Sequence, residues 1–483
     1  MTITKKAGVI GSPVKHSISP FIHEYWLKQH QLQGAYYKLF CPDTDENFND
    51  LIKKLISLGY SGVNVTLPHK KRAYAIANSF SETAIALGVA NTLTFSQNGI
   101  HADNTDAYGF EESIKEVISD TDQKSLALVL GAGGAAPAVC FALHNAGFQK
   151  IIVANRSNDK AQNLVQDFSF ITTSCLWSDI DTLVPDADII VNCTSLGMPG
   201  SADLDVSLTD AKDSAIVADI IYIPLETGLV KAARERGLRT TNGLPMLMHQ
   251  ATTGLYSWYG KKPEVSARLE AHLIDVLENW GNLPIKIGLT GSIGMGKSTA
   301  AKVLAKMGAA VWDADTAVHR LYQAGGAAVP VLKEHFPDVI VDDAVSRDLL
   351  SKHLMENADD FKLLERLVHP LVAIDREKFI KEATKQNVQA VILDVPLLFE
   401  TGQSHHFDEV IVVTADLDIR KERVLARPGM TEKKLASIVS RQMSEEEKIL
   451  LADHVIRTDG THEETASEIE SVFHKILDNY EKS

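Results

Sequence analysis

The sequence predicts an α/β protein in which two nucleotide-binding units follow one another along the chain. Two glycine-rich loops support this prediction, because each lies between a short β-branched strand and the start of a helix. The first loop begins at Gly131 and the second at Gly291. A chain of 483 residues has room for about three domain-sized units. We therefore expect one protein unit to end near residue 278 and a second to begin at residue 285.

The composition is that of an ordinary globular protein, with 45% hydrophobic and 23% charged residues. The net charge of −15 disfavours nucleic acid and anionic membranes as general partners, although a local basic pocket can still bind phosphates. The N-terminus lacks the apolar segment of a signal peptide, and no apolar run is long enough to span a bilayer. We expect a cytoplasmic protein with no membrane or nucleic-acid partner.

The cysteines form no C-x-x-C pair, which indicates neither a zinc site nor a disulfide framework, and we expect buried thiols at Cys41, Cys140, Cys175 and Cys193.

Two serines follow the first predicted strand, which covers residues 8–11. Ser19 stands directly before Pro20, which suits an N-cap and a first-turn proline of a helix that runs to about Leu32. Capping explains Ser19 but does not explain Ser17. Two hydroxyls beside a helix start could bind a small carboxylate, so both interpretations stay open.

A second strand begins at Gly62 and ends in polar side chains. Asn64 and Thr66 share one face of this strand, while the intervening valines take the other, which we expect to face the core. Open α/β sheets bind ligands at such strand ends. Lys70 follows in a basic run of four residues, for which a solvated helix surface is the alternative.

Three more polar residues stand near predicted element ends. Asn91 lies on a short strand, and Asp106 stands where the N-cap of a helix belongs. Capping of that helix and catalysis are equally open for Asp106. Gln250 lies on a helix that opens after the turn at residues 242–243, where a solvated glutamine is the alternative.

The first glycine loop fits the dinucleotide fingerprint G-x-G-x-x-[GA]. It covers residues 131–136, after a buried strand and before a helix that ends near Gly147. The next strand ends at Asn155, and Arg156 follows where such folds read the adenosine ribose. An acidic residue there would favour NAD, whereas Arg156 can pair with the 2′-phosphate of NADP. We therefore expect NADP(H).

Residues 5 to about 278 together resemble shikimate dehydrogenases. The resemblance rests on residues 11–20, 64–70, 90–92, 104–106, 131–135, 155–156 and 242–250. It implies a shikimate-binding catalytic domain over residues 1–105, a Rossmann-like NADP domain over 106–239 and helices over 240–278 that return to the catalytic domain. It also implies that shikimate, with its carboxylate on the two serines, is held by Ser17, Ser19, Asn64, Thr66, Asn91, Asp106, Tyr222 and Gln250.

The same resemblance implies the catalytic pair, Lys70 and Asp106. Reduction of the C3 ketone of 3-dehydroshikimate builds negative charge on oxygen, which Lys70 can neutralise while Asp106 orients its ammonium. Ser157 and Ile220 stand where many relatives have threonine or methionine, and neither touches the proposed chemistry. The implied NADP contacts are Gly131, Ala132, Gly133, Gly134, Ala135, Asn155, Arg156, Ser157, Ile220 and Gly243.

A short linker over residues 279–284 precedes the second unit, whose loop fits G-x-x-x-x-G-K-[ST]. Backbone N–H groups of such a loop cradle phosphates, its lysine reaches the terminal ones and its hydroxyl holds Mg²⁺. A glycine-rich turn that caps an ordinary helix is the alternative. The expected ATP contacts of the loop are Gly291, Ser292, Ile293, Gly294, Met295, Gly296, Lys297, Ser298 and Thr299, with Ser298 as the metal ligand.

Charged side chains follow this loop at predicted element ends. One strand ends in Asp313 and Asp315, which would share one face, although one of them could cap the next helix. Asp394 ends a buried strand and is a candidate ligand for Mg²⁺ or its water. Arg427 and Arg441 are candidate lid arginines that close over phosphates, and a solvated helix with Arg–Glu pairs is the alternative.

Residues 285 to about 475 resemble dephospho-CoA kinases, in residues 288–299, 313–315, 369–370, 394–400 and 441–442. The resemblance implies a P-loop kinase domain with a helical lid over residues 285–483, which transfers the γ-phosphate of ATP to the ribose 3′-OH of dephospho-CoA. Asp315 becomes the base or orienting group, and Lys297 neutralises phosphate charge. Asp459 departs from the asparagine that is usual before Gly460, so we assign no adenine contact there.

We therefore expect a bifunctional enzyme with independent sites, because the two reactions share no intermediate. The expected ligands are shikimate or 3-dehydroshikimate with NADP(H), and dephospho-CoA with ATP and Mg²⁺; a homodimer is a candidate assembly. Two alternatives stay open for the first unit. It could be a quinate-preferring dehydrogenase, against which Ser17, Thr66 and Arg156 speak, or a non-catalytic NADP sensor that regulates the kinase, against which Lys70 and Asp106 speak.

Overall fold

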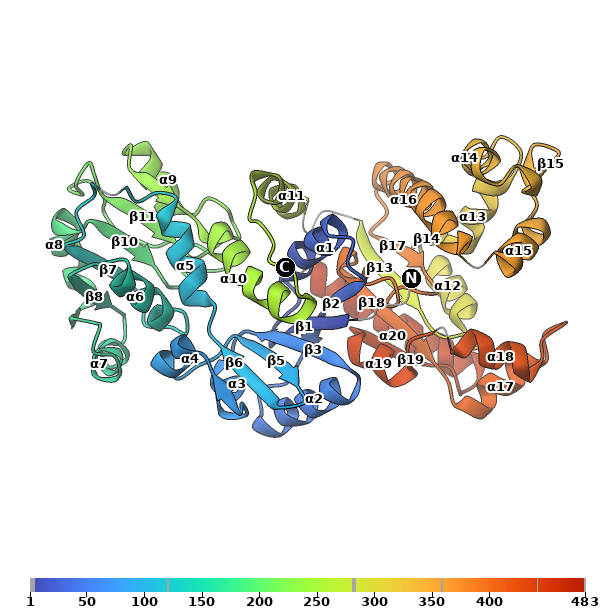
Figure 1. Ribbon diagram of the computed structural model, residues 1–483, viewed down its shortest axis with the longest axis horizontal. Helices are drawn as coiled ribbons and strands as arrows, with labels where there is room; N and C mark the ends of the chain where they lie inside the picture. Colours follow the sequence, from blue (N-terminus) through green and yellow to red (C-terminus); the bar gives the residue numbers. More distant parts are fainter. Residues whose placement is uncertain (1–4, 120, 280–283, 358, 441, 482–483) are drawn as a thin grey trace. The chain divides into compact units, whose positions relative to one another are not determined.

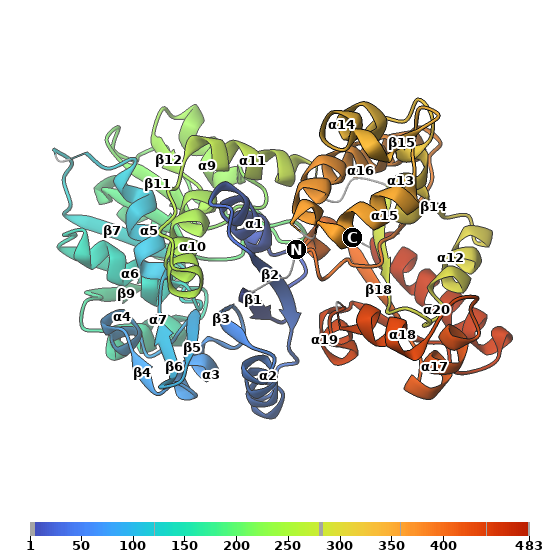
Figure 2. The same ribbon diagram turned by 45° about the vertical axis from the view of Figure 1, so that its right-hand side comes forward.

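The computed structural model describes residues 5–119, 121–279, 284–357, 359–440 and 442–481. The chain divides into two compact units, which we call the first unit, Thr4–Glu278, and the second unit, which begins at Asn279. Helices and strands alternate through both units, and most neighbouring strands are parallel, which confirms the predicted α/β class (Figures 1 and 2). Within the described ranges, no helix is long and apolar enough to cross a membrane.

The first sheet of the first unit has the strand order β2-β1-β3-β5-β6-β4. Strand β3 is parallel to β1 and antiparallel to β5, and the register pairs Asn64 with Thr92. The sheet therefore places the expected substrate residue Asn64 beside Thr92, the residue that follows Asn91. Its strands are β1 (Lys5–Gly11), β2 (Gly34–Phe40), β3 (Tyr60–Val65), β4 (Ser79–Phe80), β5 (Thr92–Ser96) and β6 (Gly99–Asp103), with helices α1 (Ser19–Gln29), α2 (Asp45–Ser57), α3 (Lys70–Ala75) and α4 (Glu82–Leu87).

Two expectations about helix starts are wrong. The N-cap of α1 is Ile18, so Ser19 is the first helical residue and caps nothing with its side chain; the helix also ends at Gln29, before Leu32. Similarly, Thr105 is the N-cap of the helix that Asp106 begins, and no side chain caps it. The side chains of Ser19 and Asp106 are therefore not used for capping and can make other contacts.

The second sheet of the first unit has the order β12-β11-β10-β7-β8-β9, and every neighbouring pair is parallel. Apolar clusters cover both faces, one around Val129 and Val139 and the other around Leu128 and Leu229. This is the doubly wound arrangement expected of a dinucleotide-binding fold. Its strands are β7 (Leu126–Leu130), β8 (Lys150–Ala154), β9 (Thr173–Cys175), β10 (Ile189–Asn192), β11 (Ile216–Asp219) and β12 (Arg239–Thr241), with α5 (Asp106–Lys115), α6 (Ala136–Asn145), α7 (Asn158–Asp167), α8 (Ile180–Leu183) and α9 (Gly228–Glu235).

Helix α10 (Gly243–Tyr259) links the two sheets, and α11 (Ala267–Glu278) follows it. Asn242 caps α10 by accepting a hydrogen bond from Leu244 N at 3.0 Å. One part of α10 lies beside α5 in both views (Figures 1 and 2). Near its other end, Trp258 Nε1 donates to the carbonyl of Leu93 on β5 at 3.1 Å. The helix thus fixes the first sheet against the element that carries Asp106.

The second unit has a five-stranded parallel sheet in the order β14-β17-β13-β18-β19. Its strands are β13 (Ile285–Thr290), β14 (Ala310–Asp313), β17 (Ala390–Asp394), β18 (Glu409–Thr414) and β19 (His454–Arg457). A separate apolar cluster around Leu332 and Leu350 holds α13 (Ala314–Tyr322), α14 (Ala328–His335), the hairpin β15 (Ile340–Val341) and β16 (Ala344–Val345), α15 (Arg347–Glu356) and α16 (Asp360–Lys385) together. The remaining helices are α12 (Lys297–Lys306), α17 (Leu417–Leu425), α18 (Glu432–Val439), α19 (Glu445–Leu451) and α20 (His462–Glu481).

The cysteines are free thiols, as the sequence predicts, and three of them are buried. Cys175 is only half-buried at the end of β9, so the expectation of burial is wrong there. An edge strand leaves one side open to water, which explains the difference.

His23 lies in the core of the first unit without a hydrogen-bond partner among the described residues. Both ring nitrogens are buried and unpaired, and the ring stacks on Tyr36 with centroids 3.9 Å apart and planes at 6°. Burial lowers the pKa of His23 to about 3. The side chain is therefore neutral near pH 7 and contributes an aromatic stacking contact.

We predict that His23→Phe makes the first unit less sensitive to acid. The pKa of His23 falls from 6.5 to about 3 on folding. The contribution of neutral His23 to the free energy of unfolding is therefore fully present above pH 6.5 and decreases as the pH falls toward 3. Each pH unit in this window costs about 1.4 kcal/mol of unfolding free energy. Urea unfolding followed by tryptophan fluorescence at pH 7 and pH 5 measures the effect, and an unchanged acid sensitivity in the variant would contradict it.

Candidate functional site

A lysine–aspartate pair lies at the centre of the first candidate site. Lys70 is the first residue of α3 and Asp106 the first residue of α5, and Lys70 Nζ lies 2.6 Å from Asp106 Oδ2. Only 14% of the lysine side chain and 13% of the aspartate side chain are exposed. Because the site is partly desolvated, removal of either side chain would leave the charge of the other uncompensated. The structure therefore brings the two expected catalytic residues together.

Asn91 holds the other oxygen of the aspartate. Its Nδ2 donates to Asp106 Oδ1 at 2.8 Å, and its Oδ1 accepts from Thr105 N at 2.8 Å. Thr92 Oγ1 also donates to Asn91 Oδ1 at 3.0 Å. Asn91 is buried and fully engaged, so its main effect is to orient Asp106.

Gln250 joins this network because α10 and α5 pack closely at a glycine. A Cβ on Gly109 would lie 2.6 Å from the carbonyl oxygen of Met246 and 2.7 Å from Gln250 Cβ, so any larger residue would separate the helices. Gln250 Oε1 accepts from Thr105 Oγ1 at 3.3 Å. The glutamine is buried, and the alternative of a solvated glutamine is wrong.

The other expected substrate residues lie at the ends of β1, β3 and β11. Ser17 Oγ accepts from Ser19 N at 3.3 Å, in a loop that packs on the end of β3, since a Cβ on Gly11 would lie 2.5 Å from Thr66 Cγ2. Tyr222 follows β11, and within the described residues no hydrogen bond links it to the Lys70–Asp106 pair. Burial raises the pKa of Tyr222 to about 12, so its hydroxyl stays a donor near neutral pH.

The first glycine loop lies against the end of β10 and is tied to the end of β8. Gly131 has φ of +109° and a Cβ there would lie 2.8 Å from Thr194 Cγ2, so only glycine fits. Ala132 N donates to Asn155 Oδ1 at 3.1 Å, and Asn155 Nδ2 donates to the carbonyl of Ser157 at 2.9 Å. The loop and the residues at the end of β8 therefore form one surface. The backbone of Gly133, Gly134 and Ala135 continues from this loop into α6.

Arg156 extends from this surface as an exposed guanidinium. It lies 5.8 Å from the ring centroid of Trp177 and forms no ion pair with any residue in the described part of the chain. Gly243 lies on the opposite side of the sheet's end, where a Cβ would lie 2.1 Å from the carbonyl oxygen of Ile220. The exposed guanidinium suits a phosphorylated dinucleotide, whereas the close approach at Gly243 is a packing contact within the protein.

Sequence reasoning assigned no role to Asp219, which links two of these loops. Its buried carboxylate accepts from Asn192 Nδ2 at 3.1 Å, from Ile221 N at 3.0 Å and from Thr227 Oγ1 at 2.8 Å. Asn192 Oδ1 in turn accepts from Thr194 N at 2.9 Å. Burial raises the pKa of Asp219, and these hydrogen bonds oppose the shift. An acid at the end of a buried strand was the signal that could have identified it.

The second candidate site surrounds the loop between β13 and α12. Lys297 is the first residue of α12 and forms an ion pair with Asp394 Oδ1 at the end of β17. Gly294 and Gly296 have φ of +86° and +88°, which favours glycine at both positions. Ser298 is exposed in the first helical turn. The loop therefore presents backbone, ammonium and hydroxyl together, and it is more than a turn that caps a helix.

The two acids after β14 do not share a strand face, and that expectation is wrong. Strand β14 ends at Asp313, whose Oδ1 accepts from Thr316 N at 2.6 Å and caps α13. Asp315 already lies in the helix, is exposed, and forms no ion pair within the described residues. Burial raises the pKa of Asp394, Lys297 opposes that shift, and the charges of Asp313 and Asp315 add to it. The charges of Asp313 and Asp315 therefore reach the carboxylate of Asp394.

One arginine contacts the phosphate loop directly, and a second reaches it through Thr458. Arg420 is buried, and its Nε donates to the carbonyl of Ile293 at 3.0 Å. Arg423 Nη2 donates to the carbonyl of Thr458 at 2.7 Å, and Thr458 Oγ1 donates to the carbonyl of Met295 at 2.9 Å. Both arginines lie on α17, three residues apart on one face.

The two arginines named from the sequence have other positions. Arg427 is exposed just after α17 and forms no ion pair in the described ranges. Arg441 lies outside the described residues. Ser292 Oγ donates to Glu445 Oε2 at 2.9 Å, so the acidic start of α19 contacts the phosphate loop as well. The α17–α19 segment is thus packed on the loop and is only partly a solvated surface.

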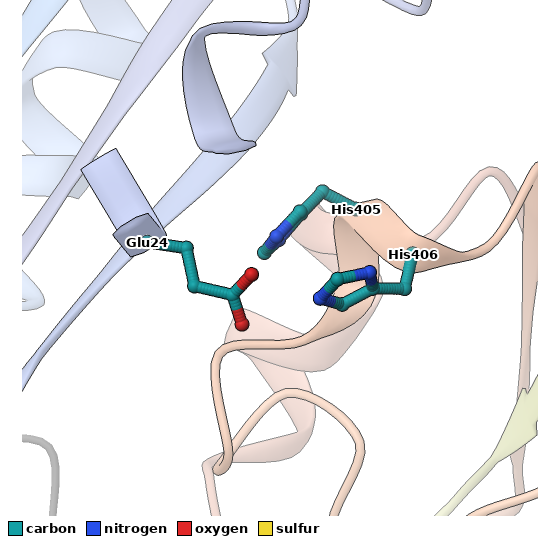
Figure 3. A group of neighbouring side chains, drawn as sticks. All are labelled: Glu24, His405 and His406. Atoms are coloured by element: carbon teal, nitrogen blue, oxygen red, sulfur yellow. The ribbon is translucent and has the colours of Figure 1, made fainter. Parts of the chain in front are cut away.

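Two adjacent histidines form a separate feature of the second unit (Figure 3). His405 and His406 lie on the short helix η4 (Ser404–His406), and their ring centroids are 4.4 Å apart. Glu24, drawn in the same figure, belongs to the first unit and forms an ion pair with Lys28 at 2.7 Å on its own helix. Its carboxylate is therefore compensated within α1.

Family models match both parts of the chain. Residues 9–93 match the shikimate dehydrogenase substrate binding domain, residues 112–221 match shikimate / quinate 5-dehydrogenase, and residues 285–464 match dephospho-CoA kinase. The NADP(+) shikimate dehydrogenase of Rhodopseudomonas palustris is 43% identical over 272 residues, which cover 56% of this chain and 97% of that protein. That of Azorhizobium caulinodans is 41% identical over 281 residues, 58% of this chain and 99% of that protein.

Solved structures resemble the first unit. A shikimate dehydrogenase in complex with NADP+ has a TM-score of 0.52 and 32% identity, and the match covers 57% of this chain and 96% of that one. The quinate dehydrogenase of Corynebacterium glutamicum in complex with NAD has a TM-score of 0.53 and 28% identity, with 56% and 98% coverage. The similarity therefore extends over nearly all of each relative.

We predict that Gly109→Ala impairs the first site. The added methyl group would lie 2.6 Å from the Met246 carbonyl and push α5, with Asp106, away from α10. Overpacking of this kind costs about 1–3 kcal/mol of stability, and a displaced catalytic group costs about tenfold to hundredfold in kcat/KM. Thermal unfolding and NADP+ reduction with shikimate measure the two effects.

Gly228→Ala is the matched control for this variant. A Cβ on Gly228 meets Asp203 Oδ1 at 3.4 Å, which is ordinary contact, so both stability and kcat/KM should stay near wild type. If Gly109→Ala behaved like this control, the close helix approach would not be needed to hold Asp106.

Proposed function

Because the chain belongs to the shikimate dehydrogenase family over its first unit and carries a dephospho-CoA kinase domain in its second, we propose that it catalyses both reactions. In this proposal, the first unit reversibly reduces 3-dehydroshikimate to shikimate with NADPH. The second unit transfers the γ-phosphate of ATP to the ribose 3′-OH of dephospho-CoA. The observation that carries the proposal is that each unit contains a largely buried lysine–aspartate pair, and in the second unit this lysine belongs to the phosphate loop.

The Lys70–Asp106 pair supports ketone reduction. NADPH, when bound, supplies the hydride to the carbonyl carbon. Lys70 then stabilises the developing charge on oxygen and donates a proton from Nζ, while Asp106 keeps the ammonium oriented through the 2.6 Å contact. In the reverse direction Lys70 accepts the proton of the hydroxyl. Asn91 holds Asp106 in place throughout, because it occupies the second carboxylate oxygen.

The polar residues around this pair suit a hydroxylated ring with one carboxylate. We assign the carboxylate to the hydroxyls of Ser17 and Ser19, and the ring hydroxyls to Asn64, Thr66 and Gln250, with Tyr222 as a further contact. Asn64 and Gln250 are buried, so a ligand without matching hydroxyls would leave the remaining hydrogen-bonding capacity of these amides unused. This environment favours a ligand that supplies several hydroxyl groups in fixed positions.

The exposed Arg156 supports NADP, whose 2′-phosphate it would pair with. The glycine loop fits the pyrophosphate because Gly131 places backbone where a side chain would clash. The remaining assigned contacts are Ala132, Gly133, Gly134, Ala135, Asn155, Ser157, Ile220 and Gly243.

In the second unit, the phosphate loop supports phosphoryl transfer. Lys297 would neutralise the charge of the transferred phosphate, and Asp315 would orient the ribose 3′-OH or accept its proton. Mg²⁺, when bound, draws charge from the phosphates, and the Ser298 hydroxyl and Asp394 carboxylate are hard oxygen donors of the kind that this ion prefers. The other assigned loop contacts are Gly291, Ser292, Ile293, Gly294, Met295, Gly296 and Thr299.

The finer domain division stays part of the proposal. We assign residues 1–105 and 240–278 to shikimate binding, 106–239 to NADP binding, 279–284 to the linker and 285–483 to the kinase. A homodimer stays a prediction as well.

Assays of the purified chain test the proposal directly. Shikimate with NADP+ should give NADPH, and dephospho-CoA with ATP should give CoA. A higher kcat/KM for quinate than for shikimate would favour the quinate alternative, and absence of NADPH formation at saturating shikimate would favour a non-catalytic sensor.

We predict that the two activities can be removed separately. Lys70→Ala should lower kcat for shikimate oxidation by about 10²- to 10⁴-fold, because the general acid is lost, with kinase rates unchanged. Lys297→Ala should lower kinase kcat by about 10²-fold or more, because phosphate charge is no longer neutralised, with oxidation unchanged. Loss of both activities in either folded variant would refute independent sites.

We also predict that Arg156 determines cofactor choice. Arg156→Ala should raise the KM for NADP+ by about tenfold to hundredfold, because a charge-assisted contact is lost, while the KM for NAD+ changes less than twofold. Steady-state kinetics with both cofactors measure the ratio. Equal effects on the two cofactors would show that Arg156 does not read the 2′-phosphate.

A further inference from the structure

Asn64 has almost all of its hydrogen-bonding capacity committed to the protein. Its Oδ1 accepts from the hydroxyl of Tyr36 at 2.6 Å. Its Nδ2 donates to Thr92 Oγ1 at 3.0 Å and to the carbonyl of Asn91 at 3.4 Å. A carboxamide has two N–H donors and two acceptor lone pairs. One lone pair of Oδ1 is therefore all that Asn64 can offer to a ligand.

The partners leave only one orientation for this amide. The carbonyl of Asn91 can only accept, so the nitrogen of Asn64 must face it and the oxygen must face Tyr36. Tyr36 then has to donate, and it can do so at any pH at which the fold is stable, because burial raises its pKa well above 10. The Tyr36 hydroxyl is the one group among these contacts that holds the oxygen of Asn64 directly.

The ring of Tyr36 is itself held by aromatic packing. His23 stacks on it, and Trp258 lies beside it with ring centroids 6.1 Å apart. Since His23 has no hydrogen-bond partner in the described residues, its contribution here is the stacked contact. Tyr36 is buried on β2, so its hydroxyl has little freedom to turn away from Asn64.

The Tyr36 hydroxyl also begins a directed series of hydrogen bonds that ends at the catalytic pair. Asn64 accepts from Tyr36 and donates to Thr92, and Thr92 donates to Asn91 Oδ1 at 3.0 Å. Asn91 then donates to Asp106 Oδ1 at 2.8 Å, and Lys70 holds the other carboxylate oxygen. Each member donates toward Asp106, so the polarities reinforce one another.

We propose that Tyr36 is a positioning residue that fixes Asn64 as a single acceptor for a substrate hydroxyl. Tyr36 does not touch the substrate; it acts through Asn64. This inference rests on the proposed function, since it identifies the ligand group as a ring hydroxyl of shikimate or 3-dehydroshikimate.

Tyr36→Phe tests the proposal because it removes the hydroxyl and keeps the stacked ring. We expect the KM for shikimate to rise about threefold to tenfold, the size of one lost hydrogen bond. The kcat should stay within twofold because Asn91 and Lys70 still hold Asp106 directly, and the KM for NADP+ should stay within twofold because the cofactor contacts are untouched. An unchanged KM for shikimate would overturn the proposal.

Tyr259→Phe is the matched control. Tyr259 is also a buried tyrosine, and its hydroxyl donates to the carbonyl of Ala35 at 2.7 Å, on the residue next to Tyr36. Loss of this bond should lower the Tm about as much as loss of the Tyr36 bond, with the KM for shikimate unchanged. If both variants raised this KM equally, the effect would be structural and the proposal would be wrong.

A third variant tests whether Tyr36 acts through Asn64. In an Asn64→Ala background, Tyr36→Phe should cause no further rise in the KM for shikimate, because the group that it orients is absent. A full additional rise in the double variant would overturn the proposal.

Binding separates failure of this inference from failure of the proposed function. Calorimetric titration of the full chain with shikimate should show weaker binding for Tyr36→Phe than for the wild type. If the wild type binds shikimate with this difference but forms no NADPH, the proposed reaction fails and the positioning role stands. If the wild type turns over and both proteins bind equally, the reaction stands and the positioning role fails.

Discussion

Each unit depends on an aspartate that compensates a lysine at the start of a helix. The N-terminus of a helix carries partial positive charge, so a cation there is disfavoured unless an anion lies close by. Lys70 begins α3 and Lys297 begins α12, and each is held by an aspartate from a different element. Because both pairs are largely withdrawn from water, loss of either partner would leave an uncompensated charge. The same electrostatic arrangement is thus present in both units.

The elements that carry each pair are held by backbone geometry that tolerates no side chain. Gly109 allows α5 to lie on α10, and Gly62 leaves room for the Trp258 indole, which would lie 2.1 Å from a Cβ. In the second unit, a Cβ on Gly294 would lie 2.5 Å from Val424 Cγ2 on α17. Glycine at these positions therefore determines how closely the functional elements approach, and with them the distance between reacting groups.

Buried polar groups around the first pair are nearly all satisfied within the protein. Asn91 is saturated, Asn64 keeps one lone pair, and Asp219 links the loops after β10 and β11. Such networks are rigid because each member would lose a hydrogen bond by moving. The few hydrogen-bond donors and acceptors that remain unused define which groups a ligand must supply. Substrate selection in this unit is therefore a question of which hydrogen bonds the protein has left unused.

The sequence by itself determined the α/β class, the two glycine loops and the residues that begin or end the elements around them. Those features are local: alternation of buried residues specifies a strand, and a loop that needs positive φ specifies glycine. The Lys70–Asp106 pair was within reach of the sequence only through family resemblance, and the Lys297–Asp394 pair was not predicted at all. Only the tertiary structure decided that Gln250 meets Thr105 and that Arg420 contacts the phosphate loop. These outcomes depend on how elements distant in sequence pack together, and a local pattern contains no information about that packing.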